Sequence, residues 1–128
     1  MSHLYLKFYF DHEKEYKLII LNYWATYCSP CKEEMVDFVK LYARYKNEGV
    51  LIIGATSEGE ESLNLINKLC KLLKINYPIL YGVENKFNNE TILGLPTTFI
   101  IDKNNKVIEK IDGKRNYEYF INLLEKNK

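Results

Sequence analysis

Residues 24–32, Trp24-Ala25-Thr26-Tyr27-Cys28-Ser29-Pro30-Cys31-Lys32, are the most informative part of this 128-residue chain. They follow an apolar run of strand length and open an amphipathic segment, so they predict a turn from a strand into a helix. Pro30 fits the first helical turn, because its fixed φ suits the helix and its missing N–H would have no intrahelical partner there. Two cysteines one helical turn apart can form a disulfide without movement of the backbone. The spacing therefore predicts that Cys28 and Cys31 alternate between a dithiol and a disulfide.

The two cysteines are expected to differ in exposure and reactivity. Cys28 lies at or just before the predicted helix start, where unsatisfied N–H groups and the positive end of the helix dipole stabilise a thiolate. This position lowers a thiol pKa and makes Cys28 the expected nucleophile. Cys31, one turn further in, should be less exposed and react second. We therefore take Cys28 and Cys31 as the candidate catalytic residues and as the redox-active disulfide.

The segments next to this motif predict a parallel strand pair. Residues 18–24 and 50–55 are nearly continuous apolar runs, a pattern typical of parallel strands covered on both faces. One helix lies between them, ends at Asn47-Glu48-Gly49 and should bury one stripe of side chains. That predicted stripe consists of Cys31, Met35, Phe38, Val39 and Tyr42. We expect a strand–helix–strand unit with a right-handed crossover.

The rest of the chain predicts two more helices and an antiparallel hairpin. A helix over residues 60–73 leads to a short strand near 77–81, and a polar, Asn-rich stretch follows over 84–91. Residues 97–101 and 106–111 predict a hairpin joined by Asp102-Lys103-Asn104-Asn105. The last helix should bury Tyr117, Phe120, Ile121 and Leu124, which have helical spacing. An initial strand is expected around residues 4–10.

Composition restricts the class of protein. The 18 Lys and Arg residues nearly balance the 17 Asp and Glu residues, so no overall charge draws the chain to nucleic acid or to an anionic membrane. The length supports one hydrophobic core, and we expect a single domain over residues 1–128. No apolar run approaches the length of a membrane-spanning helix, and residues 1–7 lack the order of a signal peptide. We expect a soluble, monomeric protein, cytoplasmic unless a leader or anchor has been removed.

The chain has three cysteines, too few for a disulfide-stapled secreted scaffold. Cys70 lies on the apolar face of a predicted helix, so we expect an inert buried thiol. A zinc site would need a second pair of ligands near Cys28 and Cys31, and Cys70, His3 and His12 do not form one. Covalent c-type haem would need His after the second cysteine, where Lys32 stands. We therefore expect no metal and no cofactor.

Taken together, the order of elements and the segment Gly94-Leu95-Pro96-Thr97-Thr98-Phe99 resemble the thioredoxin fold over nearly the whole chain. Within that superfamily, residues 21–35 and 94–102 resemble the TlpA/ResA-like thiol–disulfide oxidoreductases. The resemblance implies an α/β fold with a central mixed sheet, in which a parallel βαβ half and a C-terminal antiparallel hairpin are flanked by helices. It also implies a cis peptide bond before Pro96, placed against the sulfurs.

The same resemblance implies the reaction and its partners. The expected activity is reduction of protein or peptide disulfides, with an upstream thiol reductant as electron donor. Ser29-Pro30 resembles the dipeptides of reducing members more than those of strong oxidants. We assign Trp24, Tyr27, Leu95 and Pro96 to substrate binding, with Trp24 also part of the core. The exposed backbone at Leu95 could pair with an extended substrate segment.

One departure from the thioredoxin pattern concerns the proton of the second cysteine. Asn22 stands where ordinary thioredoxins carry a buried Asp, and an amide cannot titrate. The TlpA/ResA-like group commonly uses a Glu from the loop after the next strand. Glu58 is the first candidate proton acceptor and Glu61 the second. The alternative is that both are solvated acids beside a helix start.

Two other functions stay open. A thiol peroxidase of the same superfamily would use a lone peroxidatic cysteine in a loop with Pro and Thr, and no proline precedes Thr26 at the needed offset. A binding module without chemistry would not need the intact cysteine pair and the Pro96 segment.

Overall fold

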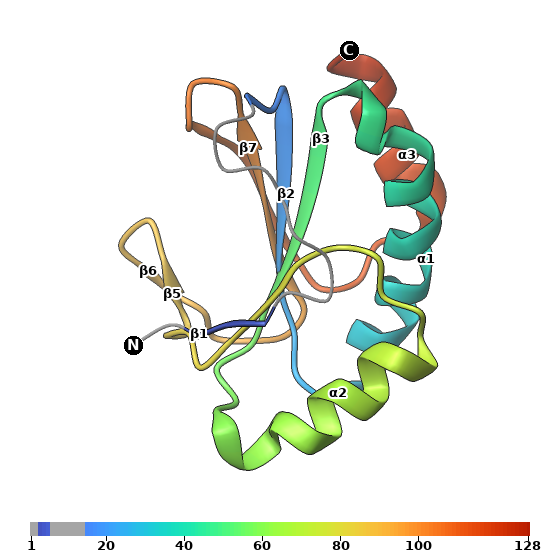
Figure 1. The fold of residues 1–128 in the computed structure, drawn as a ribbon. Helices are drawn as coiled ribbons and strands as arrows, with labels where there is room; N and C mark the ends of the chain where they lie inside the picture. Colours follow the sequence, from blue (N-terminus) through green and yellow to red (C-terminus); the bar gives the residue numbers. More distant parts are fainter. Residues whose placement is uncertain (1–2, 6–14) are drawn as a thin grey trace.

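A six-stranded mixed sheet forms the centre of the computed structural model, which describes residues 3–5 and 15–128 (Figure 1). Its strands, in spatial order, are β1 (His3–Tyr5), β4 (Ile79–Tyr81), β3 (Val50–Ala55), β2 (Leu18–Tyr23), β7 (Thr97–Asp102) and β8 (Val107–Asp112). Strands β2, β3 and β4 run parallel, whereas β7 and β8 form an antiparallel hairpin beside β2. The predicted α/β fold is confirmed. Of the predicted initial strand, residues 6–10 lie outside the described residues.

The two faces of the sheet carry different layers. Side chains of α1 (Ser29–Tyr45), α2 (Leu63–Leu72) and α3 (Tyr117–Lys126) all enter one core cluster, so the helices cover one face. Successive side chains of a strand point to opposite faces, and β2 directs Ile20 toward the helices and Leu21 away from them. The opposite face is covered by the segment around Val83 and Ile92. Both faces of β2 are therefore buried, as its continuous apolar sequence predicts.

The buried face of α1 is wider than predicted. The helix buries Cys31, Glu34, Met35, Phe38, Leu41 and Tyr45. The predicted Val39 and Tyr42 pack against the core but are only half-buried. The helix packs on the sheet and also against α3, where the Phe38 and Phe120 rings lie 5.0 Å apart. A single stripe cannot describe a helix that has two neighbours.

The other two helices begin and end close to the predicted residues. A short 3-10 turn over Glu60–Ser62 precedes α2, and another over Lys46–Glu48 follows α1 before Gly49, whose φ is 81°. On α3 the predicted Tyr117 and Ile121 are half-buried, whereas Leu123 is buried. The face of α3 is therefore rotated slightly from the predicted one.

The Asn-rich stretch forms a small hairpin that was not predicted. Strands β5 (Lys86–Phe87) and β6 (Glu90–Thr91) pair antiparallel around Asn88 and Asn89, whose φ values are 52° and 65°. Two successive residues with positive φ make the tight turn that best matches the twist of a hairpin, and Asn tolerates this conformation. Phe87 packs its ring 4.9 Å from Phe99 of β7. This contact attaches the hairpin to the face of the sheet opposite the helices.

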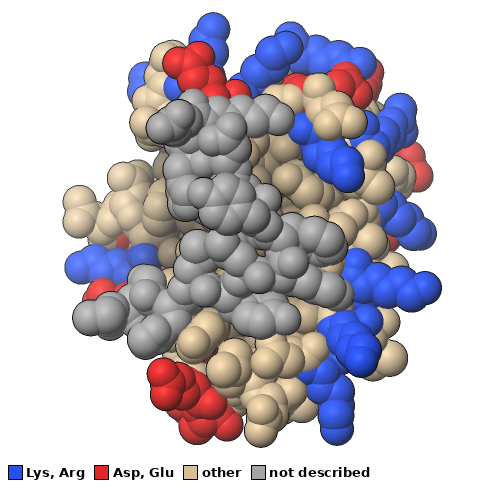
Figure 2. Space-filling model, in the orientation of Figure 1, with Lys and Arg blue, Asp and Glu red and all other residues tan. Residues whose placement is uncertain are grey.

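Charge is balanced overall but is distributed unevenly over the surface. In Figure 2, Lys and Arg side chains line the side of the molecule formed by the helices, and acidic side chains gather at the lower end. Glu60 and Glu61 lie in the turn before α2, where the positive end of a helix dipole favours acids.

Gly54 is predicted to be required for packing at the end of β3. A Cβ there would lie 2.8 Å from Ile79 Cδ1 and 3.1 Å from the indole Nε1 of Trp24. We expect Gly54→Ala to lower the free energy of unfolding by about 1–3 kcal/mol, because overpacking strains a filled core. At Gly94 nothing lies within 4 Å of such a Cβ, and Gly94→Ala should change the same quantity by less than about 1 kcal/mol. Urea denaturation measures both, and equal effects would contradict this prediction.

Candidate active site

Cys28 and Cys31 lie at the point where β2 leads into α1, and they form a disulfide. Cys28 is the N-cap of α1, with Pro30 in the first turn. The backbone N–H of Cys31 donates to Cys28 Sγ over 3.3 Å. Cys28 is 8% exposed and Cys31 is fully buried. A sulfur at a helix N-cap that accepts an N–H bond is in surroundings that favour a thiolate, whereas the inner sulfur is sheltered.

Cys28 opens into a groove of about 460 Å³, which we call the Cys28 groove. It is lined by Tyr27, Cys28, Ser29, Pro30, Asn85, Ile92, Leu93, Gly94 and Leu95, none of which is charged. Tyr27 is 78% exposed and Leu93 is 93% exposed, so large apolar side chains stand on both sides of it. Sequence reasoning missed Asn85, Ile92 and Leu93. The available signal was an Ile-Leu pair in a polar loop, directly before the Pro96 segment.

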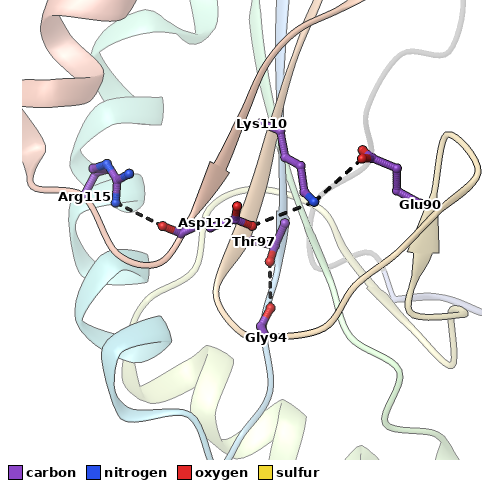
Figure 3. A network of polar contacts seen from close by, with 6 residues as sticks. All are labelled: Glu90, Gly94, Thr97, Lys110, Asp112 and Arg115. Carbon is purple, nitrogen blue, oxygen red and sulfur yellow. Dashed lines mark hydrogen bonds and ion pairs between the residues drawn. The ribbon is translucent and has the colours of Figure 1, made fainter.

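The Pro96 segment closes one side of the groove. The Leu95–Pro96 peptide bond is cis, Leu95 lines the groove, and Pro96 is buried. Thr97 Oγ1 donates to the carbonyl oxygen of Gly94 over 2.6 Å, and the N–H of Gly113 donates to the carbonyl of Pro96 over 2.9 Å. Figure 3 shows the Thr97 bond beside an ion-paired cluster in which Lys110 reaches Glu90 and Asp112. These contacts fix the segment relative to the sheet.

Trp24 does not lie at the rim of the groove. Its side chain is 1% exposed, and its indole Nε1 lies against Gly54 in the core between the sheet and the helices. The prediction that Trp24 contacts substrate is therefore wrong, while its predicted core position holds. The aromatic residue that does line the groove is Tyr27. The two differ because Trp24 continues the alternation of β2, whereas Tyr27 lies in the turn beyond it.

Glu58 contacts the loop before Cys28. Its Oε1 accepts the N–H of Thr26 over 2.8 Å, and its Oε2 accepts the Thr26 hydroxyl over 2.5 Å. A third bond comes from the hydroxyl of Thr56, over 3.0 Å. The carboxylate is therefore engaged with Thr26 and Thr56. This arrangement suits a structural contact better than the predicted proton transfer.

Glu61 is an exposed acid at a helix start. It accepts the N–H of Gly59 over 3.0 Å, and hydrogen bonds from its own backbone and from Gly59 lower the pKa of its carboxyl. A carboxyl with a lowered pKa is a poor proton acceptor near neutral pH. The role of Glu61 as second proton acceptor stays a prediction, and its exposed position in the turn before α2 matches the alternative of a solvated, helix-terminal acid.

Glu34 is a buried carboxyl that sequence reasoning missed. It follows Cys31 by three residues on the buried face of α1. Its Oε1 accepts from Asn22 Nδ2 over 3.1 Å, and its Oε2 accepts the N–H of Arg115 over 2.9 Å. Asn22 Nδ2 also donates to Thr98 Oγ1 over 3.0 Å. Asn22 thus lies beside a carboxyl from α1, at the position where thioredoxins place their own Asp.

Burial raises the pKa of Glu34 to about 7. The hydrogen bonds from Arg115 and Asn22, and the charges of Lys114 and Arg115, act in the opposite direction, but the loss of hydration is larger. Such a group exchanges a proton within the physiological range. The signal in the sequence was an acidic residue at a position three beyond Cys31, where helical periodicity predicts burial.

Among residues 3–5 and 15–128, no group of three or more His, Cys, Asp or Glu side chains could hold a metal ion. In the same part of the chain, no helix combines the length and the apolar character needed to cross a membrane. Cys70 is buried and is not part of the disulfide.

A family model described as the AhpC/TSA family matches residues 8–110. The chain belongs to the AhpC/TSA family. It is 35% identical over 111 residues to the thiol-disulfide oxidoreductase ResA of Bacillus cereus strain ZK / E33L, covering 86% of this chain and 63% of that protein. It is 40% identical over 98 residues to ResA of Geobacillus thermodenitrificans, covering 76% and 55%. The chain thus spans less than two thirds of the length of these relatives.

Solved structures agree on the fold of this family member. A thiol:disulfide interchange protein of the thioredoxin family from Chlorobium tepidum TLS matches with a TM-score of 0.74 and 28% identity, covering 87% of this chain and 79% of that one. StoA from Bacillus subtilis matches with a TM-score of 0.71 and 21% identity, covering 88% and 85%. The resemblance to thioredoxin-like proteins is confirmed.

The raised pKa of Glu34 makes stability depend on pH. The folded protein holds this proton more tightly than the unfolded chain, so the contribution is complete below about pH 4.5 and is lost as pH rises through about 7. The difference between 4.5 and about 7 corresponds to about 3 kcal/mol. Between pH 5 and pH 8 we expect the free energy of unfolding of the wild type to fall. The fall should exceed that of Glu34→Gln by up to about 3 kcal/mol. Urea denaturation at both pH values measures this, and parallel pH dependence would contradict the assignment.

Proposed function

We propose that this protein is a dithiol–disulfide oxidoreductase that reduces disulfide bonds in proteins or peptides. The observation that carries the proposal is the position of the cysteine pair: Cys28 caps α1 at the floor of an uncharged groove, and Cys31 is buried behind it. The relatives named ResA support the same chemistry. Tyr27 and Leu93 are largely exposed at this groove and offer apolar contact area, which supports a protein or peptide substrate.

The reaction has two exchange steps. The Cys28 thiolate attacks one sulfur of the substrate disulfide, forms a mixed disulfide and releases the other substrate sulfur as a thiolate. The Cys31 thiolate then attacks Cys28 Sγ, which forms the Cys28–Cys31 disulfide and releases the second substrate thiolate. Two electrons pass from the cysteine pair to the substrate, and both released thiolates can take up protons. An upstream thiol reductant must return two electrons before the next cycle.

Glu34 is the proposed acceptor for the proton of Cys31, in place of Glu58 and Glu61. Burial disfavours the thiolate of Cys31, so release of the substrate needs a base. Cys31 and Glu34 are one helical turn apart on the same buried face of α1. A pKa of about 7 lets the Glu34 carboxylate accept a proton near neutral pH. Glu58 accepts hydrogen bonds from Thr26 and Thr56 and does not share the buried face of α1 with Cys31.

Trapping tests the order of attack. We expect Cys31→Ser to accumulate a mixed disulfide with a peptide disulfide, because the resolving thiol is missing. Mass spectrometry of digested protein should locate the adduct on Cys28. Cys31→Ser combined with Cys70→Ala should trap equally well, and Cys28→Ser should trap none. An adduct on Cys70 would contradict the proposal.

A peroxide assay distinguishes the proposed disulfide reductase from the main alternative, a thiol peroxidase. A thiol peroxidase needs only the attacking cysteine for the first step, so Cys31→Ser would still reduce one equivalent of hydrogen peroxide. Fast peroxide reduction together with no turnover of disulfides would reject the proposed function in favour of a peroxidase. Binding of a partner without either reaction would favour a binding module.

The role of Glu34 predicts a specific change in the pH profile. In the wild type, kcat/KM for a peptide disulfide should rise as the pH passes through about 7 and Glu34 ionises. We expect Glu34→Gln to lose this rise near pH 7, and its kcat/KM at pH 7.5 should be at least about tenfold lower than that of the wild type. Asp37→Asn, a half-exposed acid on the same helix, should keep the wild-type profile. If Glu34→Gln also keeps it, water is the proton acceptor.

A further inference from the structure

Both sides of the Cys28 groove are hydrogen-bonded to one short segment, residues 56–58, which follows β3. We propose that this segment sets the width of the groove, that Glu58 is its positioning residue, and that the width determines how well a polypeptide disulfide reaches Cys28. This inference rests on the proposed function and concerns substrate choice rather than the exchange chemistry.

The Cys28 side of the groove is held by the side chain of Glu58. Its two oxygens accept the N–H and the hydroxyl of Thr26, the residue directly before Tyr27. These bonds join residues 32 positions apart in the sequence. Because Tyr27 is highly exposed and lies between Thr26 and Cys28, the bonds to Thr26 fix where this aromatic side of the groove begins.

The opposite side is held mainly by the backbone of the same segment. The N–H of Gly82 donates to the carbonyl of Glu58 over 2.8 Å, and the N–H of Val83 donates to the carbonyl of Thr56 over 3.1 Å. Asn85 Nδ2 donates to Ser57 Oγ over 3.2 Å. Asn85 lines the groove, and its carbonyl accepts the N–H of Ile92, which lines it too.

A carboxylate suits the centre of this arrangement. The three groups that face Glu58 are the N–H of Thr26 and the hydroxyls of Thr26 and Thr56, and all three can donate. An ionised carboxylate is an acceptor only, so it satisfies all three at once. A glutamine keeps one acceptor, and its amide nitrogen can donate to the Thr26 hydroxyl once that hydroxyl rotates. Alanine removes all three bonds.

The arrangement predicts different effects on large and small substrates. A polypeptide disulfide must pass between Tyr27 and Leu93 and contact both sides of the groove. A small disulfide needs only access to Cys28 Sγ. Loss of the Glu58 bonds should therefore weaken binding of a polypeptide and leave the reaction of the thiolate largely unchanged.

The experiment compares insulin with hydroxyethyl disulfide, using dithiothreitol as electron donor. We expect Glu58→Ala to raise KM for insulin about tenfold, because the loop that carries Tyr27 loses both of its hydrogen bonds to Glu58 and no longer holds the groove at one width. Its kcat for insulin and its kcat/KM for hydroxyethyl disulfide should stay within about threefold. Glu58→Gln should restore KM for insulin to within about threefold, since an amide keeps most of the contacts. Ser57→Ala removes the bond to Asn85 on the opposite side of the groove, and it should also raise KM for insulin without changing the reaction of hydroxyethyl disulfide.

Glu84→Ala is the matched control, because it removes an exposed acid of the segment next to Asn85. It should leave both substrates unchanged, and thermal unfolding of each variant checks the fold. The proposal is overturned if Glu58→Ala leaves KM for insulin unchanged, or if it slows both substrates equally, which would place Glu58 in the thiol chemistry.

A second measurement does not depend on turnover. Amide hydrogen exchange at Thr26 should be faster in Glu58→Ala than in Glu58→Gln and the wild type, because the Thr26 N–H loses its acceptor. Unchanged exchange would overturn the positioning role. If the wild type reduces neither disulfide, the proposed function fails, and the exchange rates still decide whether Glu58 holds the loop.

Discussion

The register of β2 between its two neighbours is the constraint on which the rest of the structure depends. Tyr23 at the end of β2 pairs with Ala55 at the end of β3 and with Thr97 at the start of β7. The cysteine motif follows Tyr23, segment 56–58 follows Ala55, and Pro96 precedes Thr97. Because two parallel strands end where an antiparallel one begins, three distant parts of the chain meet at one edge of the sheet. A shift of one residue would turn every side chain of β2 to the wrong face.

The sequence predicts those parts of the structure that depend on local patterns. The apolar runs of β2 and β3 and the Cys28–Cys31 spacing each have a physical signature within a few residues. The β5–β6 hairpin was missed because its strands have two residues each, and its signal is the adjacent pair Asn88 and Asn89. The structure of such short strands depends on a distant surface, here Phe99.

Among the site residues, too, those with a local sequence pattern were predictable and those that depend on distant contacts were not. Cys28 and Cys31 were predictable from spacing, whereas Glu34 was not, because a charged residue is expected at the surface. Its burial depends on Asn22, 12 residues earlier, and on the backbone of Arg115, 81 residues later. The contacts of Glu58 could not be predicted for a similar reason. The sequence places it near the motif, but only the fold shows that its oxygens face Thr26.

For the proposed function, the β5–β6 hairpin separates recognition from reactivity. The part of the groove opposite the cysteines comes from Asn85, directly before this hairpin, and from residues 92–95, directly after it. Neither hairpin strand is part of the six-stranded sheet. Changes around Leu93, which is almost fully exposed, can reshape the surface offered to a substrate at little cost to folding. The cysteines, Asn22 and Glu34 belong to the core and tolerate far less change. For the proposed disulfide reduction, this architecture allows one redox centre to be adapted to new substrates through a small surface loop.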